Sequence, residues 1–455
     1  MQSKMSISSA TIMLIVATSQ SVQAALFSLD PGPYLPENAS FAAWYQDTHG
    51  RALDLCLSKV LSSRVPTVPG DAPSYMCSLL PSPGVFDDTQ PLVFPSNFPD
   101  EAFWFTGDAA ITDAVTGIDL LYVSALEAAF SGGLPAEGEQ ISFARIRVRV
   151  DLPAPGTYTI THPYGVEVFE VSADDIGADG VRAINMTRDI GIGAPKTYSG
   201  ALAGDIGPFL RSVNGPYSET NPETGQVENF VGDPNLEEAV TGSPFGTNYL
   251  RIEGPNGIDL RTDLFAVSGK LSSVVLPTPA IVERATYSRS TDASGATAQQ
   301  DVFVQAPPPP GTSSFVDTAS ATVVMTEANA TGNWYGQSGS EPTPLANVGI
   351  SADNSAAIAS STPTTLAAPL VDLVIIHRAE YSLASGDLTL EASTSDETAP
   401  PTLSASASNG STIGTLSGAG ALKTLTTRIT PIPPARVTVT SANGGSDSED
   451  LVILP

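Results

Sequence analysis

The sequence is short of basic residues. Its 455 residues include 20 Lys and Arg against 48 Asp and Glu, so the formal net charge is −28. Only 15% of the residues are charged, below the roughly 25% of an average soluble domain. The acidity therefore comes from scarce basic residues. A surface that binds nucleic acid needs clustered Lys and Arg to offset phosphate repulsion, so this composition excludes a nucleic-acid partner.

Signatures of catalysis and of metal binding are also missing. The sequence has 3 histidines and 2 cysteines, and it contains no G-x-S-x-G elbow, H-E-x-x-H motif or Walker loop. Scattered histidines do not supply the closely spaced ligands of a zinc site. A catalytic triad or a carboxylate pair assembled in space stays open, because such sites are recognised by geometry. Because these motifs are missing, we favour a protein without enzymatic activity or cofactor.

Long apolar runs are absent after the N-terminus. The first 24 residues have the pattern of a secretory signal peptide: Lys4 supplies the basic start, an apolar stretch covers 11–17, and Val22-Gln23-Ala24 fits a small-x-small cleavage site. Polar residues interrupt this stretch before the roughly 20 apolar positions that a membrane span needs. We expect an exported protein without a membrane span, secreted or held at the cell surface, with the periplasm as an alternative.

The only cysteines, Cys56 and Cys77, lie 21 positions apart. In an exported protein such a pair predicts one disulfide. A metal site made of these thiols is disfavoured, because no His or further Cys lies nearby. Closing the loop between them should stabilise the fold by about 3 kcal/mol in the chain-entropy picture.

The C-terminal part of the chain contains an internal repeat. The pattern I-[VI]-x-R-A-x-Y-S occurs at 281–288 and again at 375–382. Proline-rich segments at 307–310 and 400–401 follow the two copies in the same order. Apolar residues alternate with polar ones over 388–393, which is the period of a half-buried strand. Two homologous modules of about 90 residues, built from short strands, indicate immunoglobulin-like or fibronectin-III-like sandwiches.

These modules resemble the tandem Ig-like domains appended to bacterial secreted and surface proteins. The resemblance implies a role as spacer, adhesive unit or assembly unit. Three further motifs lie in the N-terminal region: W-Y-x-D-x-x-G at 44–50, P-G-T-Y-T-I-T-H-P-Y-G at 155–165 and F-x-V-x-G-K-L at 265–271. Together they resemble a family of uncharacterised secreted bacterial β-proteins, which implies no particular activity.

The predicted fold is all-β. A hairpin is expected around the turn at 47–50, long loops over 205–248, and a closing strand over 265–271. The expected organisation is a signal peptide (1–24), a large β-sandwich with long loops, jelly-roll-like or Ig-like (25–276), a first Ig-like module (277–366) and a second one (367–455).

The densest aromatic cluster consists of Phe98, Phe103, Trp104 and Phe105, with Asp100 beside it. Aromatic faces next to carboxylates bind sugar rings, so Phe103, Trp104 and Asp100 are candidate glycan-binding residues. The competing interpretation, which we favour, is that these rings fill a sandwich core.

A basic stripe interrupts this acidic sequence. It consists of Arg145, Arg147 and Arg149, which alternate with apolar residues in the pattern of a β-strand. They are candidates for contact with an anion or an acidic partner. The favoured alternative is cross-strand pairing with carboxylates of neighbouring strands.

Asp174, Asp175 and Asp179 are the best candidates for a calcium site, because hard cations prefer several oxygens from one flexible loop. Their spacing departs from the EF-hand pattern, so an exposed acidic turn is the favoured interpretation. Calcium is the only cofactor that the sequence suggests.

The leading functional hypothesis is an exported structural or adhesive protein, in one form a surface or filament-assembly subunit with residues 25–40 as a free donor arm. Its partners would be other extracellular proteins or further copies of itself. A carbohydrate-binding protein with glycans as partners is the alternative. An extracellular hydrolase with accessory Ig-like modules is the third hypothesis.

Overall fold

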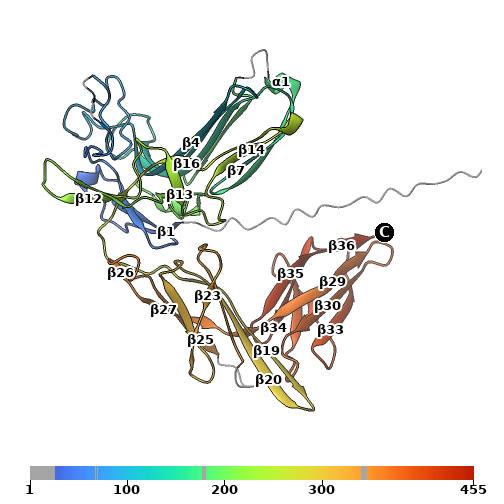
Figure 1. Ribbon diagram of the computed structural model, residues 1–455. Coiled ribbons are helices and arrows are strands. Elements are labelled where there is room, and N and C mark those ends of the chain that lie inside the picture. The colour runs from blue at the N-terminus through green and yellow to red at the C-terminus, as the bar shows by residue number, and fades with distance from the viewer. Residues whose placement is uncertain (1–25, 67, 69, 177–180, 340–345) are drawn as a thin grey trace, which may run out of the picture.

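The computed structural model describes residues 26–66, 68, 70–176, 181–339 and 346–455. The predicted signal peptide lies outside these residues. Nearly all regular structure is β, which confirms the all-β, multi-domain sandwich expected from the sequence (Figure 1). Three large hydrophobic cores follow one another along the chain, over 26–267, 280–370 and 374–439. We call the parts around them the N-terminal domain, the first module and the second module.

Three sheets build the N-terminal domain. The largest has seven strands, and its two longest members, β4 and β5, pair in antiparallel register around a turn at Gly117, whose φ is +77°. Residues on the core face of β5, such as Leu120 and Tyr122, are fully buried, while Leu121 between them is exposed. In sheet order the strands are β10 (Arg211–Ser212), β13 (Glu238–Thr241), β16 (Leu264–Ser268), β4 (Glu101–Asp113), β5 (Ile118–Phe130), β6 (Gln140–Asp151) and β9 (Ile184–Ile190).

The two smaller sheets and the short helices complete this domain. Tyr158 and Ile160 of one small sheet join the core of the large sheet. That sheet has the order β15 (Asp259–Thr262), β14 (Leu250–Glu253), β7 (Gly156–His162) and β8 (Gly165–Val171). The other has the order β1 (Leu26–Leu29), β2 (Trp44–Asp47), β3 (Ala52–Asp54), β17 (Lys270–Leu271), β12 (Val227–Phe230) and β11 (Tyr217–Thr220). The helical turns are η1 (Pro36–Asn38), α1 (Ala173–Ile176), η2 (Ser199–Ala203) and η3 (Pro255–Gly257).

The structure corrects three expectations for this domain. The segment 26–29 is no free arm, because β1 pairs with β2 and Leu26 is 3% exposed. The region 205–248 is not only loop, since it contains β10 to β13. These strands are only two to four residues long, and polar residues lie opposite each other in them, such as Ser218 and Asn229. Their amino-acid composition therefore resembles that of a loop.

The closing strand expected over 265–271 is two strands in two different sheets, β16 and β17. The chain changes sheet at Gly269. A Cβ at this position would lie 2.9 Å from Leu53 Cδ1 and 3.0 Å from Val231 Cγ2, so any larger residue must displace these buried side chains. The predicted hairpin around 47–50 is confirmed as β2 and β3.

The first module consists of two facing sheets. A strand of its second sheet, β27, crosses the boundary expected at 366/367 and pairs with β25. One sheet has the order β23 (Thr326–Glu327), β24 (Asn333–Ser338), β20 (Gly295–Gln305), β19 (Ile281–Asp292) and β28 (Val371–Asp372). The other has the order β22 (Thr322–Val324), β21 (Thr312–Val316), β25 (Asn347–Asp353) and β27 (Thr364–Pro369).

The second module has the same strand order without a counterpart of β23. Its first sheet has the order β33 (Leu422–Arg428), β30 (Asp387–Thr394), β29 (Val374–Ser382) and β36 (Val452–Leu454). Its second sheet has the order β32 (Thr412–Thr415), β31 (Leu403–Ala407), β34 (Arg436–Ser441) and β35 (Ser446–Asp450).

The sequence repeat corresponds to a repeated backbone feature. The register of β19 against β20 shifts between Val282 and Arg284, and that of β29 against β30 shifts between Ile376 and Arg378. The first variable position of the motif is occupied by Glu283 in one module and His377 in the other. It is therefore the extra residue of a β-bulge in both modules.

Candidate functional site: the interdomain junctions

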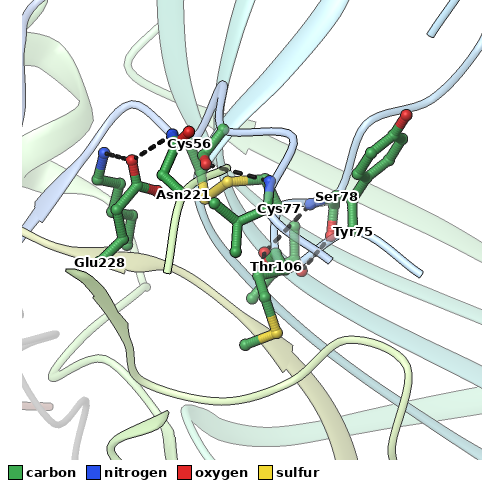
Figure 2. Close-up of a disulfide and its surroundings, with 12 residues drawn as sticks. Cys56, Tyr75, Cys77, Ser78, Thr106, Asn221 and Glu228 are labelled. Atoms are coloured by element: carbon green, nitrogen blue, oxygen red, sulfur yellow. Dashed lines mark hydrogen bonds and ion pairs between the residues drawn. A yellow bond between two sulfur atoms is a disulfide. The ribbon is translucent and has the colours of Figure 1, made fainter. Parts of the chain in front are cut away.

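The disulfide pins a polar loop onto the N-terminal domain. Cys56 and Cys77 are bonded, and they lie in a small separate core with Met76 and Phe230 (Figure 2). Next to the bridge, Ser78 Oγ lies 3.2 Å from Thr106 Oγ1 of β4. The loop is thereby tied to the large sheet.

The candidate glycan-binding aromatics lie in the core. Trp104 is 0% exposed, and its indole N–H donates to the carbonyl of Ala42 at 3.1 Å. The ring packs edge-on against Tyr45, with centroids 4.8 Å apart. All four aromatic residues of the cluster are buried: Phe98, Phe103, Trp104 and Phe105. They therefore cannot form a sugar-binding surface. Asp100 is only partly buried.

The arginine stripe lies on β6, and its members have different partners. Arg145 forms a two-bond ion pair with Asp189 of β9, at 2.7 and 2.9 Å, and lies 2.9 Å from Glu127 of β5. Burial raises the pKa of Glu127 to about 8, although Arg145 opposes the shift. Arg147 donates to the Thr187 hydroxyl at 3.2 Å, and Arg149 Nε is buried without a hydrogen-bond partner among the described residues. Cross-strand pairing thus accounts for Arg145.

The candidate calcium residues are only partly described. Asp174 and Asp175 lie in α1, and Asp179 lies outside the described residues. Asp175 accepts hydrogen bonds from the Ser172 N–H at 2.8 Å and from its hydroxyl at 2.6 Å. Within the described ranges, no group of three His, Cys, Asp or Glu side chains is placed to hold a metal ion.

The junction between the two modules is built around a buried carboxylate, Asp396 of the second module. Its side chain is 0% exposed. It accepts hydrogen bonds from Arg289 Nε at 2.7 Å and from the Tyr287 hydroxyl at 3.1 Å, both on β19 of the first module. The Asn443 side-chain amide of the second module donates to the same Tyr287 oxygen at 2.8 Å. The carboxylate therefore bonds the end of one module to the next.

Backbone hydrogen bonds reinforce this junction. The Arg289 N–H donates to the Ser395 carbonyl at 3.0 Å, and the Glu397 N–H donates to the Arg289 carbonyl at 2.8 Å. The linker strand β28 pairs in parallel with β19, so Asp372 lies opposite Tyr287. The Asp372 carboxylate is buried and accepts from the Thr394 hydroxyl and the Gly445 N–H. The linker is therefore part of the sheet.

Charge pairing decides the ionisation of Asp396. Burial alone would raise its pKa, but the hydrogen bonds from Arg289 and from the Ala399 N–H outweigh burial, and its pKa lies below the ordinary value. Burial and the neighbouring Asp396 charge raise the pKa of Tyr287 to about 12. At neutral pH the junction holds a carboxylate, a guanidinium and a neutral phenol.

The junction between the N-terminal domain and the first module is centred on His49, at the tip of the β2–β3 hairpin. His49 Nε2 lies 3.3 Å from the Thr331 carbonyl, and the His49 carbonyl accepts from Asn354 Nδ2 at 3.1 Å. The chain crosses between the domains through β18 (Leu276–Pro277), which pairs in parallel with β26 (Ser361–Thr362). The Gln46 amide donates to the Pro277 carbonyl at 3.3 Å.

The packing at His49 requires a neutral imidazole and a small neighbour. Burial lowers the pKa of His49, despite the nearby Asp47. Because Nε2 faces a carbonyl, it carries the proton, and Nδ1 is buried without a hydrogen-bond partner among the described residues. The next residue, Gly50, has φ +84°, and a Cβ there would lie 3.0 Å from Asn354 Nδ2.

Sequence reasoning missed both junctions, because their partners are far apart in the chain. Arg289 and Asp396 are separated by 107 positions, and His49 and Thr331 by 282. One signal was present: the repeated motif ends in Tyr-Ser in both modules, but the next residue is Arg289 in the first and Leu383 in the second. This departure from the repeat marks the residue that docks the second module.

The comparisons with known proteins give no family for this chain. No family model matches it, and no curated sequence matches it. Among solved structures, the teleost fish polymeric Ig receptor ectodomain matches at 7% identity and TM-score 0.20, over 38% of this chain and 98% of that chain.

Two bacterial proteins match at a similar level. A Bacteroides ovatus mixed-linkage glucan utilization protein matches at 11% identity and TM-score 0.19, over 45% of this chain and 52% of that one. A 1.5-MDa bacterial ice-binding adhesin matches at 11% identity and TM-score 0.15, over 69% and 91%. These scores are too low for any functional argument to rest on them. Separately, none of the helices in the described ranges is long and apolar enough to cross a membrane.

Proposed function

We propose that this chain is an exported structural or adhesive protein whose three β-domains act as one rigid extracellular unit. The observation that supports the proposal best is the junction at Asp396. A buried ion pair between domains is costly to form and costly to break, so it favours one fixed arrangement over a flexible tether. The disulfide fits an oxidising compartment outside the cytoplasm.

A rigid unit of this kind presents or spaces a surface at a defined distance, which is what an adhesive or scaffolding protein requires. The partners we propose are other extracellular proteins, further copies of this chain, or glycans. Strand donation by residues 26–29 is not part of the proposal, because β1 is already paired within the chain.

The proposal is tested by coating beads with the purified protein and measuring their retention on cells and on abiotic surfaces under flow. The expected result is retention above that of beads coated with an unrelated secreted β-protein. Asp396→Ala should reduce retention under load, because the junction becomes flexible. Equal retention of the wild-type and unrelated coatings would count against an adhesive role.

A further inference from the structure

A cavity of about 550 Å³ lies beside the His49 junction. The N-terminal domain supplies part of its wall through Arg51, which follows the hairpin turn, and Arg211 of β10. The first module supplies the opposite part through residues 357–361. The cavity therefore exists only where the two domains meet.

Two guanidinium groups line this cavity without a carboxylate partner. Within the described residues, neither Arg51 nor Arg211 forms a side-chain hydrogen bond or an ion pair. Asp47 acts on both arginines only through space, and its charge partly offsets their burial. Its Oδ1 accepts from the Arg51 N–H and its Oδ2 from the Phe209 N–H, both at 2.9 Å.

The environment makes these positive charges unfavourable as they stand. Burial lowers the pKa of Arg51, and burial together with the Arg51 charge lowers the pKa of Arg211 to about 10, although the charge of Asp47 opposes both shifts. A buried charge normally has a partner. The buried Arg145 has three carboxylates within 4 Å, whereas the half-buried Arg51 and Arg211 have no ion pair among the described residues. Two guanidiniums without an anionic partner can bind an anion, because each donates charge-assisted hydrogen bonds to a carboxylate, sulfate or phosphate oxygen.

The rest of the lining is partly apolar and carries no acidic group. None of the described residues that line the cavity is Asp or Glu, although the chain carries a net charge of −28. Apolar residues such as Val231, Leu271 and Ile358 form much of the wall. Hydroxyl and amide side chains also line it, among them Ser273, Ser360 and Asn229. Such groups donate hydrogen bonds to oxyanions and exchange them with ligand hydroxyls.

We propose that this cavity binds a small polar molecule through a carboxylate, sulfate or phosphate group held by Arg51 and Arg211. Both domains contribute walls, so the bound molecule also stabilises their junction. The inference stands apart from the adhesive role proposed above, since it needs only the cavity and its charges.

The test is isothermal titration calorimetry on the purified full chain at constant ionic strength, with sodium sulfate, phosphate and glucuronate as probes and glucose as a neutral control. The expected result is saturable binding of at least one anionic probe and none of glucose. Arg51→Gln and Arg211→Gln should each weaken it at least about tenfold, because each removes charge-assisted hydrogen bonds.

Two further variants keep the test decisive. Ala359→Phe fills the cavity from an exposed position of the first module and leaves both guanidiniums in place, so it should also abolish binding. Arg261→Gln removes an exposed arginine already paired with Asp263 and should change nothing. Preference for glucuronate would identify an organic acid as the ligand class, and preference for sulfate or phosphate an inorganic anion. Absence of binding, or binding that survives the two glutamine variants, would overturn the proposal.

Discussion

Replacing Asp396 with alanine should weaken the junction between the modules far more than its small size suggests. The carboxylate is 0% exposed and Arg289 is 18% exposed, so Asp396→Ala leaves a largely buried guanidinium without its charge partner. Breaking a buried ion pair from one side costs about 3–5 kcal/mol. Because Arg289 retains some contact with water, we expect a loss near the lower end, about 3 kcal/mol.

The second module supplies a matched control. Arg436 and Asp450 form an ion pair with the same Nε–Oδ1 distance, 2.7 Å, but their side chains are 56% and 73% exposed. Exposed pairs contribute about 0–1 kcal/mol, so Asp450→Ala should have little effect. The two ion pairs share their bond length and differ in burial and in the further hydrogen bonds that Asp396 accepts.

The assay is urea unfolding of the wild type, Asp396→Ala, Arg289→Ala and the double variant. A double-mutant cycle should return a coupling energy of more than about 1 kcal/mol, because the residues share one bonded network. Thermolysin cleavage near the junction should accelerate in both single variants. A coupling energy near zero, or equal losses for Asp396→Ala and Asp450→Ala, would refute the reasoning.

Three further predictions concern the N-terminal domain. Burial lowers the pKa of His49 in the folded state below its unfolded value of 6.5. The stabilisation by neutral His49 is therefore complete above pH 6.5. It is lost as the pH falls from 6.5 towards the folded pKa, because the unfolded chain takes up the proton first. The stability difference between wild type and His49→Gln, measured by urea unfolding, should therefore shrink from pH 7.5 to pH 5, and a constant difference would contradict this. Cys56→Ser with Cys77→Ser should lower the stability of this domain by about 2–5 kcal/mol, measurable by calorimetry, and an unchanged transition would show that the bridge is dispensable. Gly269→Ala should cost about 1–3 kcal/mol through overpacking against Leu53 and Val231. Gly132→Ala, whose Cβ would meet nothing closer than 3.8 Å and whose φ is not positive, should stay within about 0.5 kcal/mol; equal losses would argue against a steric crossing.

The features that could be predicted from the sequence are those with a local signal. Alternation over 388–393 predicted a half-buried strand, which is part of β30. The repeated motif predicted two related modules, and their strand orders match. The turn at 47–50 predicted a hairpin, which β2 and β3 form.

The features that could not be predicted depend on distant partners. Periodicity over 265–271 looks like one strand, and only the crowding around Gly269 shows why the chain changes sheet there. Aromatic density at Trp104 did not distinguish a binding face from a core, because Phe103, Trp104 and Phe105 are consecutive and show no alternation that would assign them to a face. Arg51 and Arg211 lie 160 positions apart in the chain, and only the fold places both in the wall of one cavity.

Pulsed electron paramagnetic resonance can measure whether the buried junctions hold the three domains in one arrangement. Spin labels fit at Val115, Val324 and Ile432, which are 93%, 76% and 74% exposed and lie one in each domain. Both native cysteines are bonded, so labels attach only to the introduced ones. We expect narrow distance distributions for Val115–Val324 and Val324–Ile432, and broadening of the second pair alone in Asp396→Ala. Broad distributions for both pairs in the otherwise wild-type chain would show that the domains move independently.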